Sequence, residues 1–134
     1  MITLPDPKAR REATKRLMEL ADTPIMACLQ CGKCTAGCPF AEDMDLAPHQ
    51  IVRFAQIGLL ETVARCEAIW YCASCFTCQS RCPVGIDIAA LAEAVRMLSL
   101  LENGERYGPD SVSSEAAAKA PQQALVSLYR KFSS

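Results

Sequence analysis

Residues 28–39 read CLQCGKCTAGCP, and residues 72–83 read CASCFTCQSRCP. Each stretch has three cysteines at three-residue intervals, followed four residues later by a Cys-Pro pair. Together the two stretches contain eight of the nine cysteines, and the ninth is Cys66. A disulfide framework explains this pattern poorly, because cysteines so close together are badly placed to pair and an odd number leaves one over. The repeat therefore indicates metal chemistry.

The spacing Cys-x2-Cys-x2-Cys-x3-Cys-Pro is that of bacterial ferredoxins, which bind [4Fe–4S] clusters. Three thiolates at this spacing can wrap around one face of a cubane, and the fourth iron then needs a cysteine from elsewhere. In two-cluster ferredoxins that cysteine comes from the other motif. Applied here, this predicts one cluster on Cys28, Cys31, Cys34 and Cys82, and a second on Cys72, Cys75, Cys78 and Cys38. Zinc is the alternative, although zinc sites favour Cys-x2-Cys pairs or mixed cysteine and histidine ligands.

The segments around the motifs have the sequence pattern of helices. Residues 6–21 are rich in helix formers, with Pro7 near the start. Between the motifs, apolar residues recur at three- and four-residue intervals, and Gly58 is expected to divide this linker into two helices, the first beginning near Pro48. We find no period-two alternation of the kind that strands require.

The region after the second motif is also predicted to be helical. Asp87 is expected to cap a long helix that stops at Asn103-Gly104. A polar linker is expected at 110–114, followed by a helix over about 121–132 that either packs on the core or docks a partner. The predicted fold class is all-α, with two cysteine-rich loops between helices. Its parts are an N-terminal helix (1–24), a two-cluster domain (25–104) and a linker with a C-terminal helix (105–134).

Composition excludes several classes of function. The chain has 134 residues and a formal net charge of −1, whereas nucleic-acid binders normally carry a basic face. The most apolar stretch, residues 86–101, is interrupted by three charged residues and cannot span a bilayer. The first residues lack a basic region followed by an apolar run, so we expect no secretory signal and a cytoplasmic location.

Beyond the cysteines, residues 25–104 resemble the C-type subunit of heterodisulfide reductase. The resemblance lies in the Gln-Cys-Gly-x-Cys-Thr-x-Gly-Cys-Pro context of residues 30–39 and in the Cys-Phe-Thr-Cys of residues 75–78. It implies an α-helical ferredoxin that relays electrons between a flavin-containing A-type subunit and a cysteine-rich B-type catalytic subunit. The chain itself has no Cys-Cys pair and no Gly-x-Gly-x-x-Gly, so it resembles the relay and not the catalyst.

An iron–sulfur subunit of a glycolate oxidase-type or glycerol-3-phosphate dehydrogenase-type complex is the second hypothesis. Those proteins usually carry the helical module fused to a Cys-Cys-Gly-containing domain, which is absent from this sequence. Under either hypothesis the chain has no active site of its own.

The remaining candidate residues receive modest roles. His49 is predicted to be a capping or surface residue, and Cys66 a buried, inert thiol. Four aromatic residues are expected to exclude water around the clusters: Phe40, Trp70, Tyr71 and Phe76. Four polar residues within the loops are candidates to donate hydrogen bonds to sulfur: Lys33, Thr35, Ser74 and Thr77.

Overall fold

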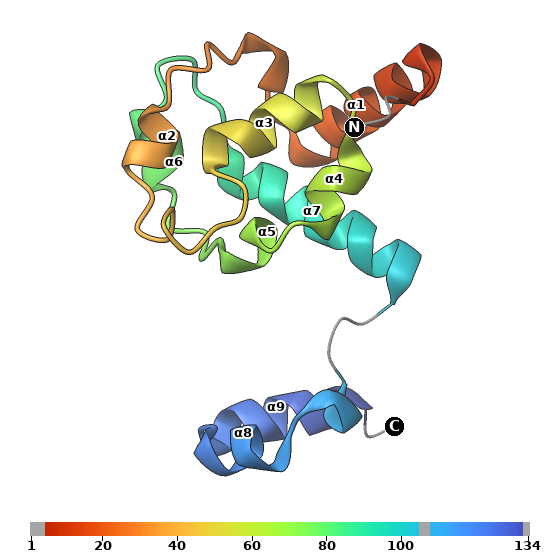
Figure 1. Ribbon diagram of the computed structural model, residues 1–134, viewed down its shortest axis with the longest axis vertical. Helices are drawn as coiled ribbons and strands as arrows, with labels where there is room; N and C mark the ends of the chain where they lie inside the picture. The colour runs from red at the N-terminus through yellow and green to blue at the C-terminus, as the bar shows by residue number, and fades with distance from the viewer. Residues whose placement is uncertain (1–4, 105–107, 133–134) are drawn as a thin grey trace. The chain divides into compact units, whose positions relative to one another are not determined.

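The computed structural model describes residues 5–104 and 108–132, and over these residues it contains helices and no strand. The predicted all-α fold class is therefore confirmed. The elements in chain order are α1 (Pro7–Ala21), η1 (Ile25–Ala27), α2 (Lys33–Ala36), α3 (Pro48–Gln56), α4 (Leu60–Arg65), α5 (Ala68–Tyr71), α6 (Thr77–Arg81), α7 (Ile88–Asn103), η2 (Pro109–Ser111), α8 (Ser114–Lys119) and α9 (Gln122–Phe132), where η marks a 3₁₀ helix (Figure 1).

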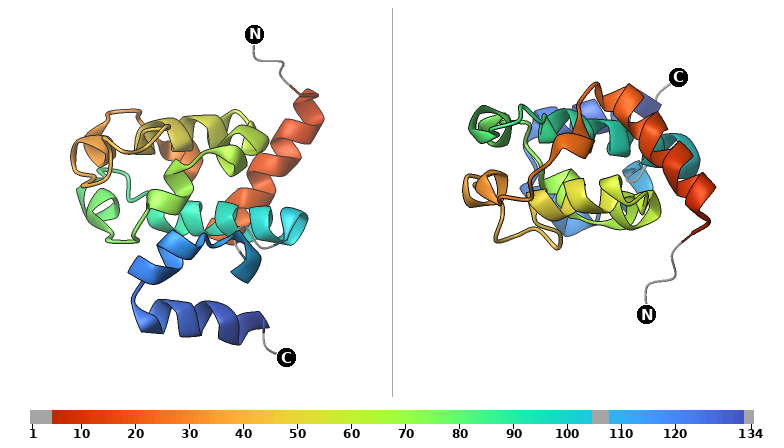
Figure 2. Two further views of the ribbon diagram at one scale, coloured as in Figure 1. Left: turned by 60° about the horizontal axis from the view of Figure 1, so that its bottom comes forward. Right: turned by 90° about the horizontal axis from the view of Figure 1, so that it is seen from above.

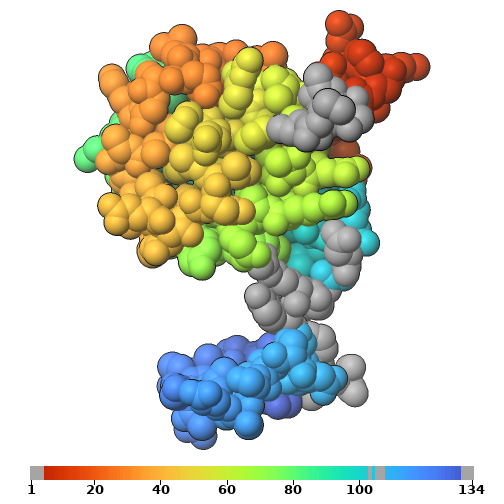
Figure 3. Space-filling view, in the orientation of Figure 1, coloured from red at the N-terminus to blue at the C-terminus, as the bar shows by residue number. Residues whose placement is uncertain are grey.

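The chain divides into two compact units, Met1–Ser99 and Leu100–Ser134. The first unit contains both cysteine motifs, and its segments form one continuous surface in the space-filling view (Figure 3). The second unit contains η2, α8 and α9. Of the expected polar linker at 110–114, Asp110 and Ser111 lie in η2, and Ser114 is the first residue of α8. This helix begins where the Ser113 hydroxyl accepts a hydrogen bond from the Ala116 N–H at 3.1 Å, ahead of a run of alanines.

The core of the first unit is built from one face of each long helix. α7 contributes Ile88, Leu91, Val95 and Leu98, which recur at helical spacing and are buried. They pack in one cluster with Leu17 of α1 and other buried aliphatic residues, namely Ile25, Ile51, Val52, Val63, Ile69 and Ile86. Cys66 is 4% exposed and belongs to this core, and burial raises the pKa of its thiol, in agreement with an inert packing role.

Hydrogen bonds connect α1 with α3 and with Ile57, the residue that follows α3. The Thr14 hydroxyl lies 3.0 Å from the carbonyl oxygens of both Arg10 and Ala55. The Arg10 guanidinium also donates to the Ile57 carbonyl at 3.4 Å. Gly58 lies against the Arg10 backbone at a φ of +74°, which turns the chain between α3 and α4 as the sequence predicted.

Candidate iron–sulfur site

The two cysteine motifs adopt the same local conformation. In each, the residue before the second cysteine and the residue after it have positive φ: 55° at Gln30 and 75° at Gly32, against 52° at Ser74 and 59° at Phe76. A short helix then follows, α2 in the first motif and α6 in the second. Left-handed residues at these positions curl each loop tightly, so that the cysteines turn toward a common side.

α2 and α6 lie side by side, and both views in Figure 2 place the two loops at the same end of the first unit. The Arg81 side chain of α6 lies over Gly37, the residue that ends α2, where a Cβ would be 2.8 Å from its Cδ. A further contact ties the motifs together. The Asp87 N–H donates to the Thr23 hydroxyl at 2.9 Å, and this bond brings the chain after Cys82 beside the chain before Cys28.

Two hollows lie at this end, and each is lined by four cysteines. The first is lined by Cys28, Cys31, Cys34 and Cys82, with aliphatic residues of α3 and α7 beside them. The second is lined by Cys38, Cys72, Cys75 and Cys78. These are the two sets that the sequence predicts to act as ligands. Each hollow takes three cysteines from one motif and the Cys-Pro cysteine from the other.

The chemistry of these donors fits an iron–sulfur cluster. Four thiols and no carboxylate line each hollow, and thiolates are the usual ligands of such clusters. Within the described part of the chain, no three Cys, His, Asp or Glu side chains converge as they would around a single metal ion.

The thiols differ in how readily they ionise. Burial raises the pKa of Cys34 in the first set and of Cys78 in the second. Cys75 is exposed, and a hydrogen bond with the Thr77 hydroxyl lowers its pKa. Cluster assembly deprotonates all four ligands, so the buried thiols need compensation from the metal charge.

The surroundings of the sulfur atoms match the expectations only in part. Of the four polar loop residues, Thr77 contacts the sulfur of Cys75 by its side chain at 3.5 Å, and the Thr35 side chain makes a hydrogen bond with the Cys34 thiol. The Ser74 hydroxyl faces Arg96 instead. Phe40 and Phe76 line the second hollow as expected. Trp70 instead packs against the hydrophobic core, and Tyr71 is 47% exposed.

His49 is placed differently from the prediction. It is half-buried and lines the first hollow, with Nδ1 2.8 Å from the Thr35 hydroxyl. The Gln30 side chain bonds its carbonyl oxygen at 3.2 Å. The prediction of a capping or surface residue is therefore wrong, because the partner loop lies 14 residues away in sequence and local pattern does not reveal it.

Asp45 links the first loop to the helix that leads into the second. Its carboxylate accepts hydrogen bonds from the N–H groups of Glu67 at 3.0 Å, Ala68 at 2.8 Å and Leu46 at 3.0 Å. Partial burial opposes its ionisation, but the backbone hydrogen bonds outweigh that effect and lower its pKa. α5 ends at Tyr71, immediately before Cys72, so Asp45 positions the start of the second loop.

Asp45→Asn is expected to destabilise the first unit by about 0.5–1 kcal/mol, because the amide offers one acceptor oxygen where the carboxylate offers two and solvent screens this largely exposed site. Urea unfolding of the iron-loaded protein measures the change. Asp43→Asn, at an exposed position two residues earlier, is the matched control and is expected to change stability by no more than a few tenths of a kcal/mol. Equal effects of the two variants would contradict the positioning role.

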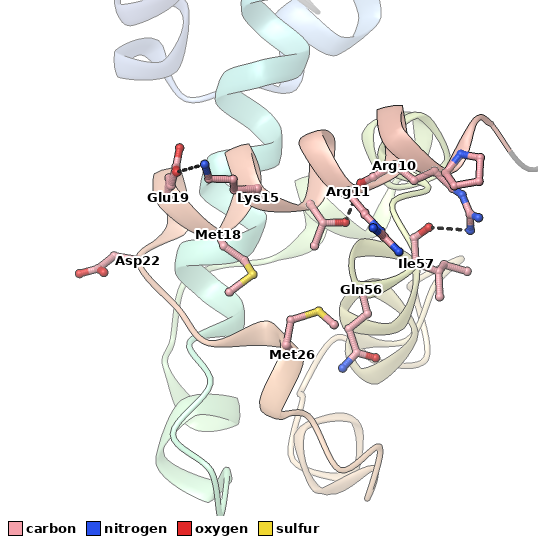
Figure 4. A pocket seen from close by; sticks show the side chains of 11 residues that line it. Arg10, Arg11, Lys15, Met18, Glu19, Asp22, Met26, Gln56 and Ile57 are labelled. Carbon is pink, nitrogen blue, oxygen red and sulfur yellow. Dashed lines mark hydrogen bonds and ion pairs between the residues drawn. The ribbon is translucent and has the colours of Figure 1, made fainter.

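A hollow larger than either four-cysteine hollow lies away from the cysteines, along α1 (Figure 4). Met18 and Met26 lie within it, and Arg10 and Arg11 lie toward the start of α1. Lys15, paired with Glu19 at 3.8 Å, lies with Asp22 toward the end of the helix. This hollow is lined by no cysteine, so the size of a cavity does not locate the metal chemistry of this protein.

Comparison with known proteins agrees with the cysteine geometry. Residues 24–86 match the family described as a 4Fe-4S dicluster domain. The chain is 37% identical over 75 residues to the iron-sulfur C subunit of the CoB–CoM heterodisulfide reductase of Methanopyrus kandleri, an alignment that covers 56% of this chain and 39% of the relative. It is 37% identical over 87 residues to the C subunit of the ferredoxin:CoB-CoM heterodisulfide reductase of Methanosarcina mazei, covering 64% and 53%.

A third relative matches over more of the chain. The C subunit of the ferredoxin:CoB-CoM heterodisulfide reductase of Methanosarcina acetivorans is 30% identical over 125 residues, which cover 81% of this chain and 49% of the relative. The chain thus spans about half the length of the curated relatives that it matches. None of the described helices combines the length and the apolar character that a membrane span requires.

Proposed function

Because its cysteine-bearing region places this chain in the family of heterodisulfide reductase C-type subunits, we propose that it is an electron-transfer subunit with two [4Fe–4S] clusters. The proposal rests on one observation above all. Two hollows, each lined by four cysteines drawn from both motifs, lie where the loops before α2 and α6 come together, and these two helices contact each other. When bound, each cluster supplies a site that accepts and releases one electron.

The chain's own residues hold and insulate these sites. Cys28, Cys31, Cys34 and Cys82 are the proposed ligands of one cluster, and Cys72, Cys75, Cys78 and Cys38 those of the other. Aliphatic side chains such as Val52 and Ile86 line the first hollow, and Phe40 lines the second. They keep water from the sulfur atoms on the inner side, which helps to set the reduction potential.

We further propose that electrons pass through this protein between a flavin-containing A-type subunit and a cysteine-rich B-type catalytic subunit. Neither motif offers a catalytic residue apart from the ligands, so bond cleavage or formation belongs to a partner. The cytoplasm is the proposed location, because a reducing compartment keeps nine unpaired thiols available for cluster assembly.

Iron and acid-labile sulfide analysis of anaerobically purified protein tests the proposal. We expect about eight of each per chain, since two [4Fe–4S] clusters contain that number. After dithionite reduction, the EPR spectrum is expected to show two magnetically interacting clusters, because α2 and α6, which follow the two loops, contact each other. Zinc without iron, in protein never exposed to oxygen, would contradict the proposal. Co-purification on an affinity-tagged chain then identifies the partners, and partners without flavin or paired Cys-Cys motifs would contradict the relay.

A further inference from the structure

The two sets of cysteines have different hydrogen-bond donors around their sulfur atoms. In the first set, Gln30 donates twice to Sγ of Cys28, from its side-chain Nε2 at 3.2 Å and from its backbone N at 3.4 Å. The Ile86 N–H also donates to Sγ of Cys82, at 3.3 Å. Three N–H groups therefore point at the sulfur atoms of one proposed cluster.

The side chain of Gln30 is fixed in this orientation. Its Nε2 also donates to the His49 carbonyl oxygen at 3.2 Å, so the two N–H bonds of the amide are divided between a sulfur and a carbonyl. Reversing the amide would turn its oxygen toward two acceptors, which excludes the flipped orientation. His49 is itself held by Thr35, with the His49 N–H 3.3 Å from the Thr35 hydroxyl. This network leaves the amide little freedom to withdraw from the sulfur.

In the second motif, the side chain at the equivalent position contacts an arginine and not a cysteine sulfur. Ser74 stands where Gln30 stands in the first motif, and both have left-handed backbone conformations. The Ser74 hydroxyl lies 3.5 Å from the guanidinium of Arg96, which also donates to the Cys72 carbonyl at 3.3 Å. The charge of Arg96 is balanced by Glu93 at 2.8 Å. In this set the backbone N–H groups of Thr77 and Gln79 bond the sulfur atoms of Cys75 and Cys78, and the Thr77 hydroxyl lies 3.5 Å from Sγ of Cys75 on the exposed side of the loop. The two sets therefore differ by the side-chain amide that Gln30 directs at a sulfur atom in the first set.

Hydrogen bonds to cluster sulfur favour the reduced state. An added electron increases the negative charge on the sulfur atoms, so an N–H that points at them stabilises the reduced form more than the oxidised form and raises the reduction potential. From this asymmetry we propose that Gln30 makes the cluster on the Cys28 set the higher-potential centre of the two. It follows that an electron that enters the protein resides on the cluster of the Cys28 set before it leaves. The inference rests on the proposed two-cluster function.

The test is Gln30→Met in the full chain, with clusters loaded anaerobically. Methionine has a similar length and no side-chain donor, while the backbone N–H of residue 30 remains. In a redox titration followed by EPR, with dithionite as reductant, we expect the higher-potential step to become about tenfold harder to reduce, a shift of about 59 mV for a one-electron couple. The lower-potential step is expected to stay in place. Ser74→Ala, at the matched position of the second motif, should leave the higher-potential step unchanged.

A second variant covers the case in which methionine packs badly. Gln30→Glu keeps the shape and replaces the donor by a negative charge, so it is expected to lower the same step further. The titration of either variant is compared with that of the unaltered protein only when the two proteins have the same iron content. An unchanged titration at full iron content, or a shift confined to the lower-potential step, would overturn the proposal. Loss of iron from both variants would also overturn it, since Gln30 would then serve cluster assembly. If the unaltered protein held no iron, the proposed function itself would fail.

Discussion

Cys82→Ser is expected to remove about half of the iron, leaving about four atoms per chain, and to free the thiols of Cys28, Cys31 and Cys34. The reason is that each hollow is lined by three cysteines of one motif and by the Cys-Pro cysteine of the other. Cys82 belongs to the second motif in sequence but lines the hollow of the first. A serine hydroxyl is a poor ligand for iron in such a cluster, so the three cysteines that remain there hold it weakly.

Alkylation of the native protein under anaerobic conditions, followed by mass spectrometry, identifies which thiols become reactive. If each motif supplied all four ligands of its own cluster, Cys82→Ser would instead expose Cys72, Cys75 and Cys78. The two arrangements therefore give opposite labelling patterns at the same iron content. Labelling of the Cys72 group would contradict the crosswise assignment.

Cys38→Ser is the matched variant in the first motif. It is expected to lose the same amount of iron and to expose Cys72, Cys75 and Cys78, because Cys38 lines the second hollow. Cys66→Ser is the control for cysteine replacement itself. Cys66 lies in the aliphatic core and lines neither four-cysteine hollow, so its replacement should leave the iron content unchanged while lowering stability.

Local sequence signals accounted for most of the fold. The helix over Ile88–Asn103 begins where the Asp87 carboxylate accepts a hydrogen bond from the Ala90 N–H at 2.9 Å, which the short polar residue before an apolar run predicts. α3 begins at Pro48, the residue expected near its start. Proline, glycine and capping residues act within one turn of themselves, so a sequence reveals their effect directly.

The surroundings of the cysteines could be predicted only to the level of residue type. Gln30 and Asp45 contact groups that lie about twenty residues away, at His49 and at Glu67 and Ala68. Such bonds exist because the fold brings two loops together, and no periodicity or spacing signals them. A glutamine between two cysteines has no distinctive pattern, so the sequence does not indicate that Gln30 donates to sulfur. Its hydrogen bonds to Cys28 depend on its positive φ and on the position of His49.

Gly58 is expected to tolerate no side chain, for one local reason, its backbone conformation, and one distant reason, its contact with α1. Its φ of +74° costs a residue with a Cβ about 1–2 kcal/mol. A Cβ at this position would also lie 2.5 Å from Cβ of Arg10 and 2.6 Å from its carbonyl oxygen. These are atoms at or next to the backbone of α1, so no change of rotamer relieves the contact, and α1 must move away from α3.

Gly58→Ala is therefore expected to destabilise the first unit by about 3 kcal/mol or more, as the strain of the left-handed conformation adds to the cost of overpacking. Gly104→Ala is the matched control: its φ is also +74°, but a Cβ there would meet nothing within 4 Å, so about 1–2 kcal/mol is expected. Urea unfolding of the two iron-loaded variants measures the free energy of unfolding of each. The difference between them is the cost of the steric contact with α1, since both variants carry the backbone strain. Because α1 leads through η1 into Cys28, the displaced helix should also make Gly58→Ala release iron faster to a chelator than the control does. Equal stability and equal iron release in the two variants would show that α1 does not rest on Gly58.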